Sequence, residues 1–312
     1  MKIVILDTET ISDGSLDFSA IERLGETEYH ASCSSACAAQ YCRGAFAVLI
    51  NRFHVDGNFL DACPSVRYIG TFSTGYNQID LEACRARGVC VCNVPAYSTS
   101  AVSQHAICLM LMLAGKAHLY ASDVSAGKWE EANYSIFCHH PEEVYGKVFG
   151  VFGLGNIGRA TAKIAEALGM RVIVHTRSDS SPYPAVSKED LFRRSDFLSL
   201  HAPLTAQTER FVDAPSLALM KPTAYLINTA RGGLIDEDAL ADALNRNALA
   251  GAALDCTVNE PVRPTDAIFQ AKNCLITPHI AWGATETRQR LTEQVAENLR
   301  CFLTGVPKNR VV

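Results

Sequence analysis

Short apolar runs that alternate with helical patterns along almost the whole chain are the feature that most restricts the fold. The runs are four to six residues long, rich in β-branched or aromatic side chains, and end at Gly, Asp, Asn or Pro. Because they are apolar throughout, they predict parallel sheets covered by helices on both faces, which is the α/β class. The predicted strands are 3–6, 45–50, 67–70, 89–92, 148–152, 171–175, 197–200, 225–228, 251–254 and 274–277. The predicted helices between them include 157–168 and 237–245, the second capped by Asp236.

Two segments depart from this alternation and indicate how the domains are arranged. Residues 101–125 have the pattern of one long helix, and residues 126–146 are irregular and rich in aromatic residues and histidine. This stretch predicts a crossover from one α/β domain into another, and 312 residues are typical of about two domains. The last helix, predicted over 285–304, is also long. If it returns to the first domain, that domain is discontinuous and the second is inserted into it.

The strongest local motif, Gly-Leu-Gly-Asn-Ile-Gly, directly follows a predicted strand and opens a predicted helix. This is the context that a dinucleotide-binding turn requires. Gly153 permits the tight turn, Gly155 lets the backbone approach a pyrophosphate, and Gly158 lets the helix pack close to the strand. The free N–H groups at the helix start, around Asn156 and Ile157, would hold the phosphates. A glycine-rich turn in some other α/β fold is the alternative.

The end of the next predicted strand bears on the choice between NAD and NADP. NAD-specific sites place an Asp or Glu there, which binds the ribose 2′-OH. In this sequence His175 is followed by Thr176, Arg177 and Ser178, and Asp179 comes later. Arg177 and Ser178 suit a 2′-phosphate, because a guanidinium binds phosphate through two parallel hydrogen bonds. The sequence therefore favours NADP(H), with a solvated Arg177 and less selective NAD binding as the alternative.

Three further segments follow predicted strands at the edge where α/β sheets bind ligands. Arg231 lies between a strand and two glycines, from where its guanidinium can pair with a carboxylate. Glu260 stands in an Asn-Glu-Pro loop, and His279 stands in a Pro-His-Ile-Ala-Trp segment. A carboxylate beside an imidazole fixes its tautomer and raises its pKa, which makes this pair a candidate for acid–base chemistry. The alternatives are a surface arginine, a solvated glutamate and a structural histidine.

Composition argues against several classes of partner. Lys and Arg number 28 against 33 Asp and Glu, which gives a net charge of -5 without blocks of like charge, so no nucleic acid is expected. The apolar run at 106–114 is too short to span a bilayer, so no membrane is expected. The N-terminus has the pattern of a first β-strand and not of a signal peptide.

The twelve cysteines are the unusual feature of the composition. Cys33, Cys37 and Cys42 lie close together, but they have no His/Cys partners at zinc spacing. We expect reduced thiols in the cytoplasm, most of them acting as small apolar residues. A local redox or metal role at 33–42 and a set of disulfides are the alternatives. No metal is expected to take part in the reaction.

The order of these motifs resembles the D-isomer-specific 2-hydroxyacid dehydrogenases. GLGNIG, NTARGGLID, NEP and PHIAW follow one another as in that family. Further segments are similar to its glycerate dehydrogenase (hydroxypyruvate reductase) branch: STGYN at 73–77, YST at 97–99, AVSQH at 101–105, GKW at 127–129, FC at 137–138 and HIAW at 279–282. The resemblance implies two Rossmann-like domains. A doubly wound, parallel-sheet cofactor domain over 97–285 would be inserted into a smaller flavodoxin-like substrate domain made of 1–96 and 286–312.

The resemblance also implies roles for individual residues. Arg231 would hold the substrate carboxylate and polarise its carbonyl, His279 would be the general acid/base, and Glu260 would pair with it. The backbone N–H groups of Thr74 and Gly75 would hold the carboxylate from the other domain. The residues implied to bind the cofactor are Asp255 at the nicotinamide carboxamide, Thr229 and Ala230 beside the nicotinamide, and His201 and Pro203 near the adenosine ribose.

The expected activity is hydride transfer between NAD(P)H and a small anionic 2-keto acid to give a D-2-hydroxy acid. Hydroxypyruvate or glyoxylate, giving D-glycerate or glycolate, is the expected pair. Hydride transfer to a keto carbon leaves an alkoxide, which needs a proton donor such as an imidazolium and a cation that holds the substrate. A larger 2-keto acid, or a non-catalytic NAD(H)-sensing protein of the same fold, is the alternative. The family usually forms homodimers through the segment that corresponds to 101–145.

Two other dehydrogenase classes fit the sequence poorly. No tyrosine is followed four residues later by lysine, as a short-chain dehydrogenase requires. A formate dehydrogenase of the same fold pairs its histidine with glutamine, whereas this chain has Glu260.

Overall fold

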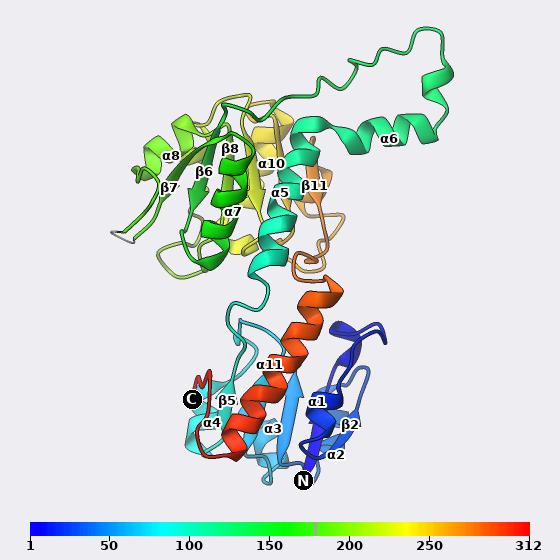
Figure 1. Cartoon of the computed structure of the whole chain (residues 1–312), viewed down its shortest axis with the longest axis vertical. Coiled ribbons are helices and arrows are strands. Elements are labelled where there is room, and N and C mark those ends of the chain that lie inside the picture. The colour runs from blue at the N-terminus through cyan, green and yellow to red at the C-terminus, as the bar shows by residue number, and fades with distance from the viewer. Residues whose placement is uncertain (178–179) are drawn as a thin grey trace. The chain divides into compact units, whose positions relative to one another are not determined.

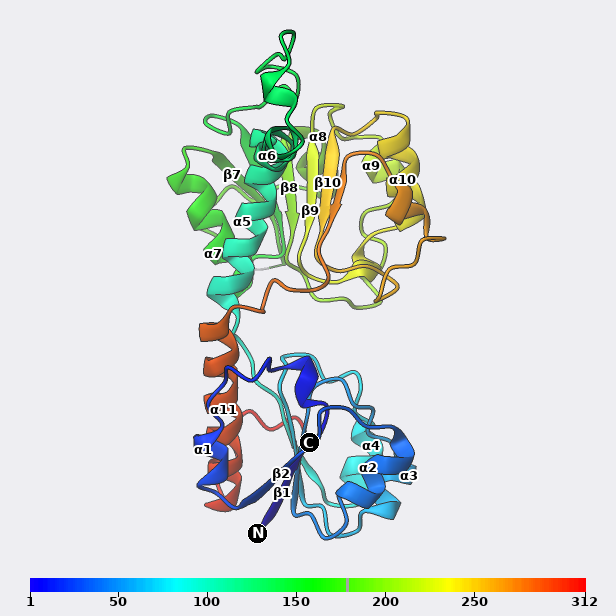
Figure 2. The ribbon, with the colours of Figure 1, turned by 90° about the vertical axis from the view of Figure 1, so that its right-hand side faces the viewer.

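The chain forms two compact units in the computed structural model, which describes residues 1–177 and 180–312 (Figure 1, Figure 2). Unit 1 consists of Met1–Ser98 together with Gly283–Val312, and unit 2 is Thr99–Trp282. The chain therefore passes between units at 98/99 and 282/283, where the sequence analysis put these passages at 96/97 and 285/286. Unit 1 contains both chain ends, and unit 2 is one continuous stretch between its two parts.

Unit 1 has a five-stranded parallel sheet with the strand order β2-β1-β3-β4-β5. Its strands are β1 (Lys2–Ile5), β2 (Glu26–Tyr29), β3 (Ala47–Ile50), β4 (Tyr68–Thr71) and β5 (Cys90–Cys92). Its helices are η1 (Thr8–Thr10), α1 (Ser19–Glu22), α2 (Ser35–Tyr41), α3 (Gly57–Ala62), α4 (Leu81–Ala86) and α11 (Thr285–Leu303). β2 is not among the predicted strands, because this edge strand has the polar sequence Glu-Thr-Glu-Tyr and no fully buried residue.

The C-terminal segment joins unit 1 through α11 and the last residues. α11 packs against α1 and β4, with Leu291 and Leu299 buried on one helical face. Val311 then donates its N–H to the carbonyl of Val91 at 2.7 Å, and Val91 donates to the carbonyl of Val312 at 3.1 Å. The end of the chain therefore pairs with β5, and both termini contribute to one core.

Unit 2 has a six-stranded parallel sheet with the order β11-β10-β9-β8-β6-β7. Its strands are β6 (Val148–Phe152), β7 (Arg171–His175), β8 (Phe197–Leu200), β9 (Tyr225–Asn228), β10 (Gly251–Leu254) and β11 (Cys274–Ile276). Its helices are α5 (Thr99–Gly115), α6 (Ala117–Ser125), η2 (Lys128–Glu130), α7 (Asn156–Ala167), α8 (Lys188–Arg194), α9 (Ala214–Leu217), η3 (Gly232–Leu234), α10 (Glu237–Asn245) and η4 (Ala267–Gln270).

Helices cover both faces of this sheet, which confirms the predicted α/β class and its doubly wound sheet (Figure 2). Alternate side chains of β6 face opposite sides. Val148 and Phe152 pack in the core formed with α8 and α10, whereas Phe149 and Val151 pack in the core formed with α5 and α7. This two-sided burial explains why the strand sequences are mostly apolar.

The expectation of a single helix over 101–125 is wrong. α5 ends at Gly115, α6 begins at Ala117, and the two helices meet at an angle of 65°. Lys116 between them has a left-handed backbone with φ of 54°, and its Nζ lies 4.9 Å from the centre of the Tyr225 ring. α6 and the residues after it project from the sheet (Figure 1). Among the described residues no single helix is long and apolar enough to cross a membrane. α5 and α6 are long and apolar enough only when they are taken together, and the chain is bent between them.

All twelve cysteines are free thiols. Cys42, Cys63 and Cys84 pack in the core of unit 1, as the sequence analysis expected for small apolar residues. Cys33 is half-buried and Cys37 is exposed, and burial raises the pKa of Cys33 to about 11. A raised pKa leaves this thiol protonated and weakly reactive.

Candidate active site

The turn after β6 has the shape of a phosphate-binding loop. Gly153 has φ of 90°, and a Cβ there would lie 2.7 Å from the backbone nitrogen of Ala202, so only glycine fits. A Cβ at Gly158 would collide with the carbonyl oxygen of Gly153. A Cβ at Gly155, by contrast, would meet nothing within 4 Å, and α7 starts after it without a side-chain cap. The first N–H groups of α7 therefore lack a side-chain acceptor, and the residues present fit a bound pyrophosphate.

The segment after β8 lies beside this turn. A Cβ at Gly153 would also lie 2.9 Å from the carbonyl carbon of His201. Nε2 of His201 lies 2.9 Å from Oγ of Ser199, and burial lowers the pKa of His201 to about 4, so the imidazole is neutral at pH 7. Pro203 follows, and its carbonyl accepts a hydrogen bond from the hydroxyl of Thr208 at 2.6 Å.

The end of β7 carries the residues expected to select the cofactor. Nδ1 of His175 lies 2.9 Å from the carbonyl oxygen of Val186, which fixes the last residue of the strand. Thr176 is half-buried and Arg177 is exposed. The prediction for Ser178 lies outside the described residues. An exposed guanidinium therefore stands where NAD-specific sites place a carboxylate.

β9 ends at Asn228, whose buried side chain shapes the turn that carries Arg231. Its Nδ2 donates to the carbonyl of Arg231 at 2.9 Å, and its Oδ1 accepts from the N–H of Ala230 at 3.0 Å. The exposed Arg231 donates from Nη1 to the carbonyl of Ala230 at 2.7 Å. Thr229 is only 7% exposed, and its hydroxyl has no hydrogen-bond partner within residues 1–177 and 180–312. A bound ligand can supply the hydrogen-bond partner that the Thr229 hydroxyl lacks.

Gly232 brings the Arg231 turn against the loop after β10. A Cβ at Gly232 would collide with the carbonyl group of Thr257 and the backbone nitrogen of Val258. The two loops are therefore in direct backbone contact. Any larger residue at this position would push Arg231 away from the loop that carries Glu260.

The loops after β10 and β11 meet at a histidine–glutamate pair. Nδ1 of His279 lies 2.8 Å from Oε2 of Glu260, and the two side chains are 30% and 37% exposed. The N–H of Thr257 donates to Oε1 of Glu260 at 3.3 Å. The carboxylate thus fixes one imidazole nitrogen while the ring keeps an exposed surface, which is the arrangement of a general acid–base pair.

Asp255, directly after β10, anchors the segment that follows β11. Its carboxylate is fully buried and accepts from the N–H groups of Ile280 and Ala281, both at 2.9 Å. The hydroxyl of Thr277 donates to it at 2.5 Å, and Nε2 of His105 lies 3.4 Å away. Burial raises the pKa of Asp255, but these hydrogen bonds outweigh it and hold the pKa below its usual value. The expected contact of Asp255 with a nicotinamide carboxamide stays a prediction.

In unit 1, the residues expected to hold the substrate carboxylate lie in the loop after β4. Thr74 donates its hydroxyl to the carbonyl of Val94 at 2.8 Å, and its own carbonyl accepts from Nδ2 of Asn93 at 2.7 Å. Neither Thr74 nor Gly75 donates its backbone N–H to another group of the described chain. Both N–H groups therefore remain available to a ligand.

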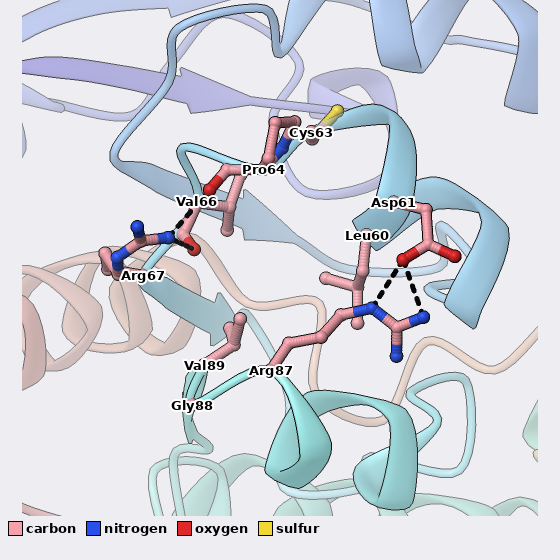
Figure 3. A pocket seen from close by; sticks show the side chains of 9 residues that line it. All are labelled: Leu60, Asp61, Cys63, Pro64, Val66, Arg67, Arg87, Gly88 and Val89. Carbon is pink, nitrogen blue, oxygen red and sulfur yellow. Dashed lines mark hydrogen bonds and ion pairs between the residues drawn. The ribbon is translucent and has the colours of Figure 1, made fainter.

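Figure 3 shows a hollow of about 440 Å³ in unit 1. It lies against residues that directly precede β4 and β5. Arg87 pairs with Asp61 at 2.7 Å, and Arg67 donates to the carbonyls of Pro64 and Val66 at 2.8 and 3.0 Å. The two guanidinium groups are thus engaged by the protein. Ligands of parallel α/β sheets bind at the opposite, carboxyl ends of the strands, so the hollow is a weaker candidate than the loops of unit 2.

Comparison with known protein families shows the family to which this chain belongs. The sequence model of the NAD-binding domain of the D-isomer specific 2-hydroxyacid dehydrogenases matches residues 107–281. This chain belongs to that family.

Two relatives of this dehydrogenase match it over almost its full length. A hydroxypyruvate reductase of Blautia hydrogenotrophica is 37% identical over 100% of this chain and 99% of its own. A glycerate dehydrogenase of Methylorubrum extorquens is 33% identical over 99% and 98%. These matches support the branch that the motifs indicated.

Solved structures agree with the fold of this 2-hydroxyacid dehydrogenase. A crystal structure of a Thermus thermophilus protein is 34% identical, with a TM-score of 0.91 and full coverage of both chains. An acyclic imino acid reductase in complex with NADPH and D-Arg is 28% identical, with a TM-score of 0.87 and full coverage of both chains.

Three side chains that shape the site of this dehydrogenase are not among the residues predicted from the sequence. Asn228 orders the Arg231 turn, and a polar residue at the end of a buried strand was a usable signal for it. His105 reaches Asp255 from a largely apolar helix, where a lone histidine is a weak signal. Cys256 lies beside the acid–base pair, and no sequence pattern distinguishes it from a core cysteine.

Proposed function

We propose that this dehydrogenase reduces hydroxypyruvate and glyoxylate with NAD(P)H, giving D-glycerate and glycolate. The names of the full-length relatives support this substrate class, since they include hydroxypyruvate reductase and glycerate dehydrogenase, and a glyoxylate reductase matches over 82% of this chain. The observation that carries the proposal is the pair formed by Nδ1 of His279 and Oε2 of Glu260, which lie 2.8 Å apart. The loop that carries Glu260 is in backbone contact with the Arg231 turn.

The residues of this site divide the chemistry between them. A bound reduced nicotinamide supplies the hydride to the keto carbon. His279 donates a proton to the oxygen as negative charge develops there, and Glu260 stabilises the imidazolium and holds its orientation. Arg231 binds the substrate carboxylate and polarises the carbonyl. In the reverse direction, His279 accepts the hydroxyl proton.

The cofactor is proposed to lie along the carboxyl ends of the strands of unit 2. The glycine-rich turn at 153–158 would hold the pyrophosphate, and Thr229 and Ala230 would line the nicotinamide side. We propose a preference for NADP(H), because Arg177 is exposed at the end of β7. The structurally similar acyclic imino acid reductase was solved in complex with NADPH, which is consistent with this preference.

We further propose a homodimer formed through residues 101–145 in a reducing cytoplasm. The projecting part of this segment exposes Trp129, Ile136 and Phe137 by 65%, 61% and 68%. Apolar side chains of this size on one projecting segment are typical of a protein–protein interface. Twelve free thiols fit a reducing compartment.

Turnover assays with purified protein test the proposal. Hydroxypyruvate, glyoxylate, pyruvate and a longer 2-keto acid are each supplied with NADH or NADPH, and oxidation of the nicotinamide is followed by absorbance. We expect the highest kcat/KM with hydroxypyruvate or glyoxylate, and chiral analysis should find D-glycerate. Faster reduction of a longer 2-keto acid would favour the alternative substrate class. Tight binding of NAD(P)H without turnover of any 2-keto acid would favour a non-catalytic sensor.

A further inference from the structure

Cys256 is a buried thiol next to the acid–base pair, and the proposed reaction does not use it. It follows Asp255 at the end of β10 and is 2% exposed. Its Sγ lies 3.5 Å from the carbonyl of Ala230, the residue before Arg231. The thiol therefore sits among the same loops that carry the proposed catalytic groups.

Three potential metal ligands converge at this point. The Cys256 sulfur, one carboxylate oxygen of Glu260 and one imidazole nitrogen of His279 all lie within 4.8 Å of one another. Sulfur, nitrogen and carboxylate oxygen are the donors that bind zinc, at about 2.3, 2.0–2.1 and 2.0–2.2 Å. Two ligand atoms on one tetrahedral zinc ion lie roughly 3.5 Å apart. The three atoms reach that arrangement through side-chain adjustments of about 1 Å.

We propose that Cys256, Glu260 and His279 form a binding site for zinc or another thiophilic divalent cation, and that the bound cation blocks turnover. The inhibition rests on the proposed function, whereas the binding does not. On binding, the Cys256 thiol releases its proton to water and the imidazole coordinates in its neutral form. No oxidation or reduction takes place. The cation occupies His279 and separates it from Glu260, so the proton donor is lost.

The charges at this site suit a divalent cation. One thiolate and one carboxylate neutralise a charge of +2, which leaves a neutral centre in a partly buried site. In the cation-free protein the thiol is neutral, because burial and the charges of Asp255 and Glu260 raise the pKa of Cys256, while Arg231 lowers it. Cys256 therefore does not disturb the acid–base pair until a cation arrives.

A second cluster in unit 2 is a natural comparison. Asp123, Cys138 and His139 also offer ligand atoms within 4.8 Å of one another. There, however, Nζ of Lys128 lies 2.7 Å from one carboxylate oxygen of Asp123, and Nε2 of His139 lies 2.6 Å from the other. An ammonium group already balances this carboxylate and repels a cation. Cys138 therefore provides a matched control for Cys256.

Cobalt(II) spectroscopy tests the binding without any activity measurement. Titration of the wild-type protein with Co²⁺ should produce a thiolate-to-cobalt charge-transfer band and the visible bands of a tetrahedral site, at one cation per chain. Cys256→Ser and Cys256→Ala should lose the charge-transfer band, and Cys138→Ala should keep it. Circular dichroism checks the fold of each variant, and the serine variant changes the side-chain volume least. Absence of the band in the wild type, or its persistence in both Cys256 variants, would overturn the site.

Turnover measured at increasing Zn²⁺ concentrations tests the inhibition. The rate of each variant is compared with the rate of the same variant without metal. Zn²⁺ should inhibit the wild type reversibly, with recovery in chelator. Cys256→Ser should raise the half-inhibitory zinc concentration by at least about tenfold, since even an outer-shell change costs about that much affinity. A cobalt band in a protein that reduces no 2-keto acid supports the site and overturns the proposed function. Turnover that zinc leaves unchanged in a protein with the band overturns the inhibition.

Discussion

Replacing Gly232 by alanine should separate the two loops that hold the proposed substrate and proton-transfer groups. Gly232 follows Arg231 directly, and a Cβ at this position points into the backbone of the loop that leads to Glu260. The alanine side chain adds no charge and no flexible atoms. Its effect therefore measures how much turnover depends on the spacing between the Arg231 turn and the histidine–glutamate pair.

The size of the effect follows from the contacts of the added atom. The Cβ would lie under 3.0 Å from three backbone atoms of Thr257 and Val258, whereas ordinary contacts begin at 3.4 Å. The loops must move apart by about 1 Å, and a misplacement of that size can cost about 10²-fold in rate. Forcing one extra methyl group into packed structure also costs about 1–3 kcal/mol of unfolding free energy.

The assay compares this variant with Gly233→Ala. At Gly233 the added Cβ would lie 2.9 Å from Cδ2 of Leu204, which is 43% exposed and can rotate away. We expect Gly232→Ala to lower kcat/KM by about 10²-fold and Gly233→Ala to stay within a few-fold of wild type. Urea unfolding separates loss of folded protein from loss of rate. A folded Gly232→Ala protein with turnover within twofold of wild type would refute the link between loop spacing and chemistry.

Three further outcomes are expected. His279→Ala should lower kcat by about 10²–10⁴-fold, and the exposed His54→Ala should leave it unchanged; near-full turnover without His279 would exclude it as proton donor. Arg177→Ala should raise KM for NADPH and spare NADH, whereas equal effects on both would count against 2′-phosphate binding. His201 should make the fold acid-sensitive, because its pKa is about 4 in the folded chain and 6.5 in the unfolded chain. The unfolded chain therefore binds a proton first as the pH falls, so the unfolding free energy is highest above pH 6.5 and is about 2–3 kcal/mol lower at pH 4.5. His201→Gln should flatten that slope in urea titrations.

Most strands of unit 2 were predictable because nearly all of their residues are buried. Five predicted ranges agree with the structure at both ends: Val148–Phe152, Arg171–His175, Phe197–Leu200, Tyr225–Asn228 and Gly251–Leu254. Side chains on both faces of these strands are in a core, so most positions are apolar, and Arg171, His175, Ser199 and Asn228 are the exceptions. β2 lacked this signal, because an edge strand with exposed faces can carry Glu and Thr.

The break between α5 and α6 was not predictable from hydrophobic periodicity. Gly115 ends the first helix and Lys116 takes up a left-handed backbone, a conformation that Lys rarely adopts. The side chain of Lys116 then contacts the ring of Tyr225, which comes more than 100 positions later. Local sequence patterns carry no information about such a distant partner.

The site was predictable in its chemistry and not in its contacts. The strand-end positions of Arg231, Glu260 and His279 marked them as candidates. Whether Glu260 touches His279 depends on tertiary structure, and the 2.8 Å separation answers that question. The convergence of Cys256 on the same pair depends on loop packing after β10, which no motif encodes.

The register of the parallel sheet explains why residues up to 48 positions apart meet in one site. Leu254 of β10 is paired with Asn228 of β9 on one side and with Ile276 of β11 on the other. The three strands therefore end level, and their loops leave the sheet at the same edge. A slip of one residue in any strand would turn its apolar side chains into the opposite core, so burial itself holds the strand ends level. The core thus fixes where the reacting groups emerge, and the loops beyond it are free to set the substrate, the cofactor and, through Cys256, the response to a cation.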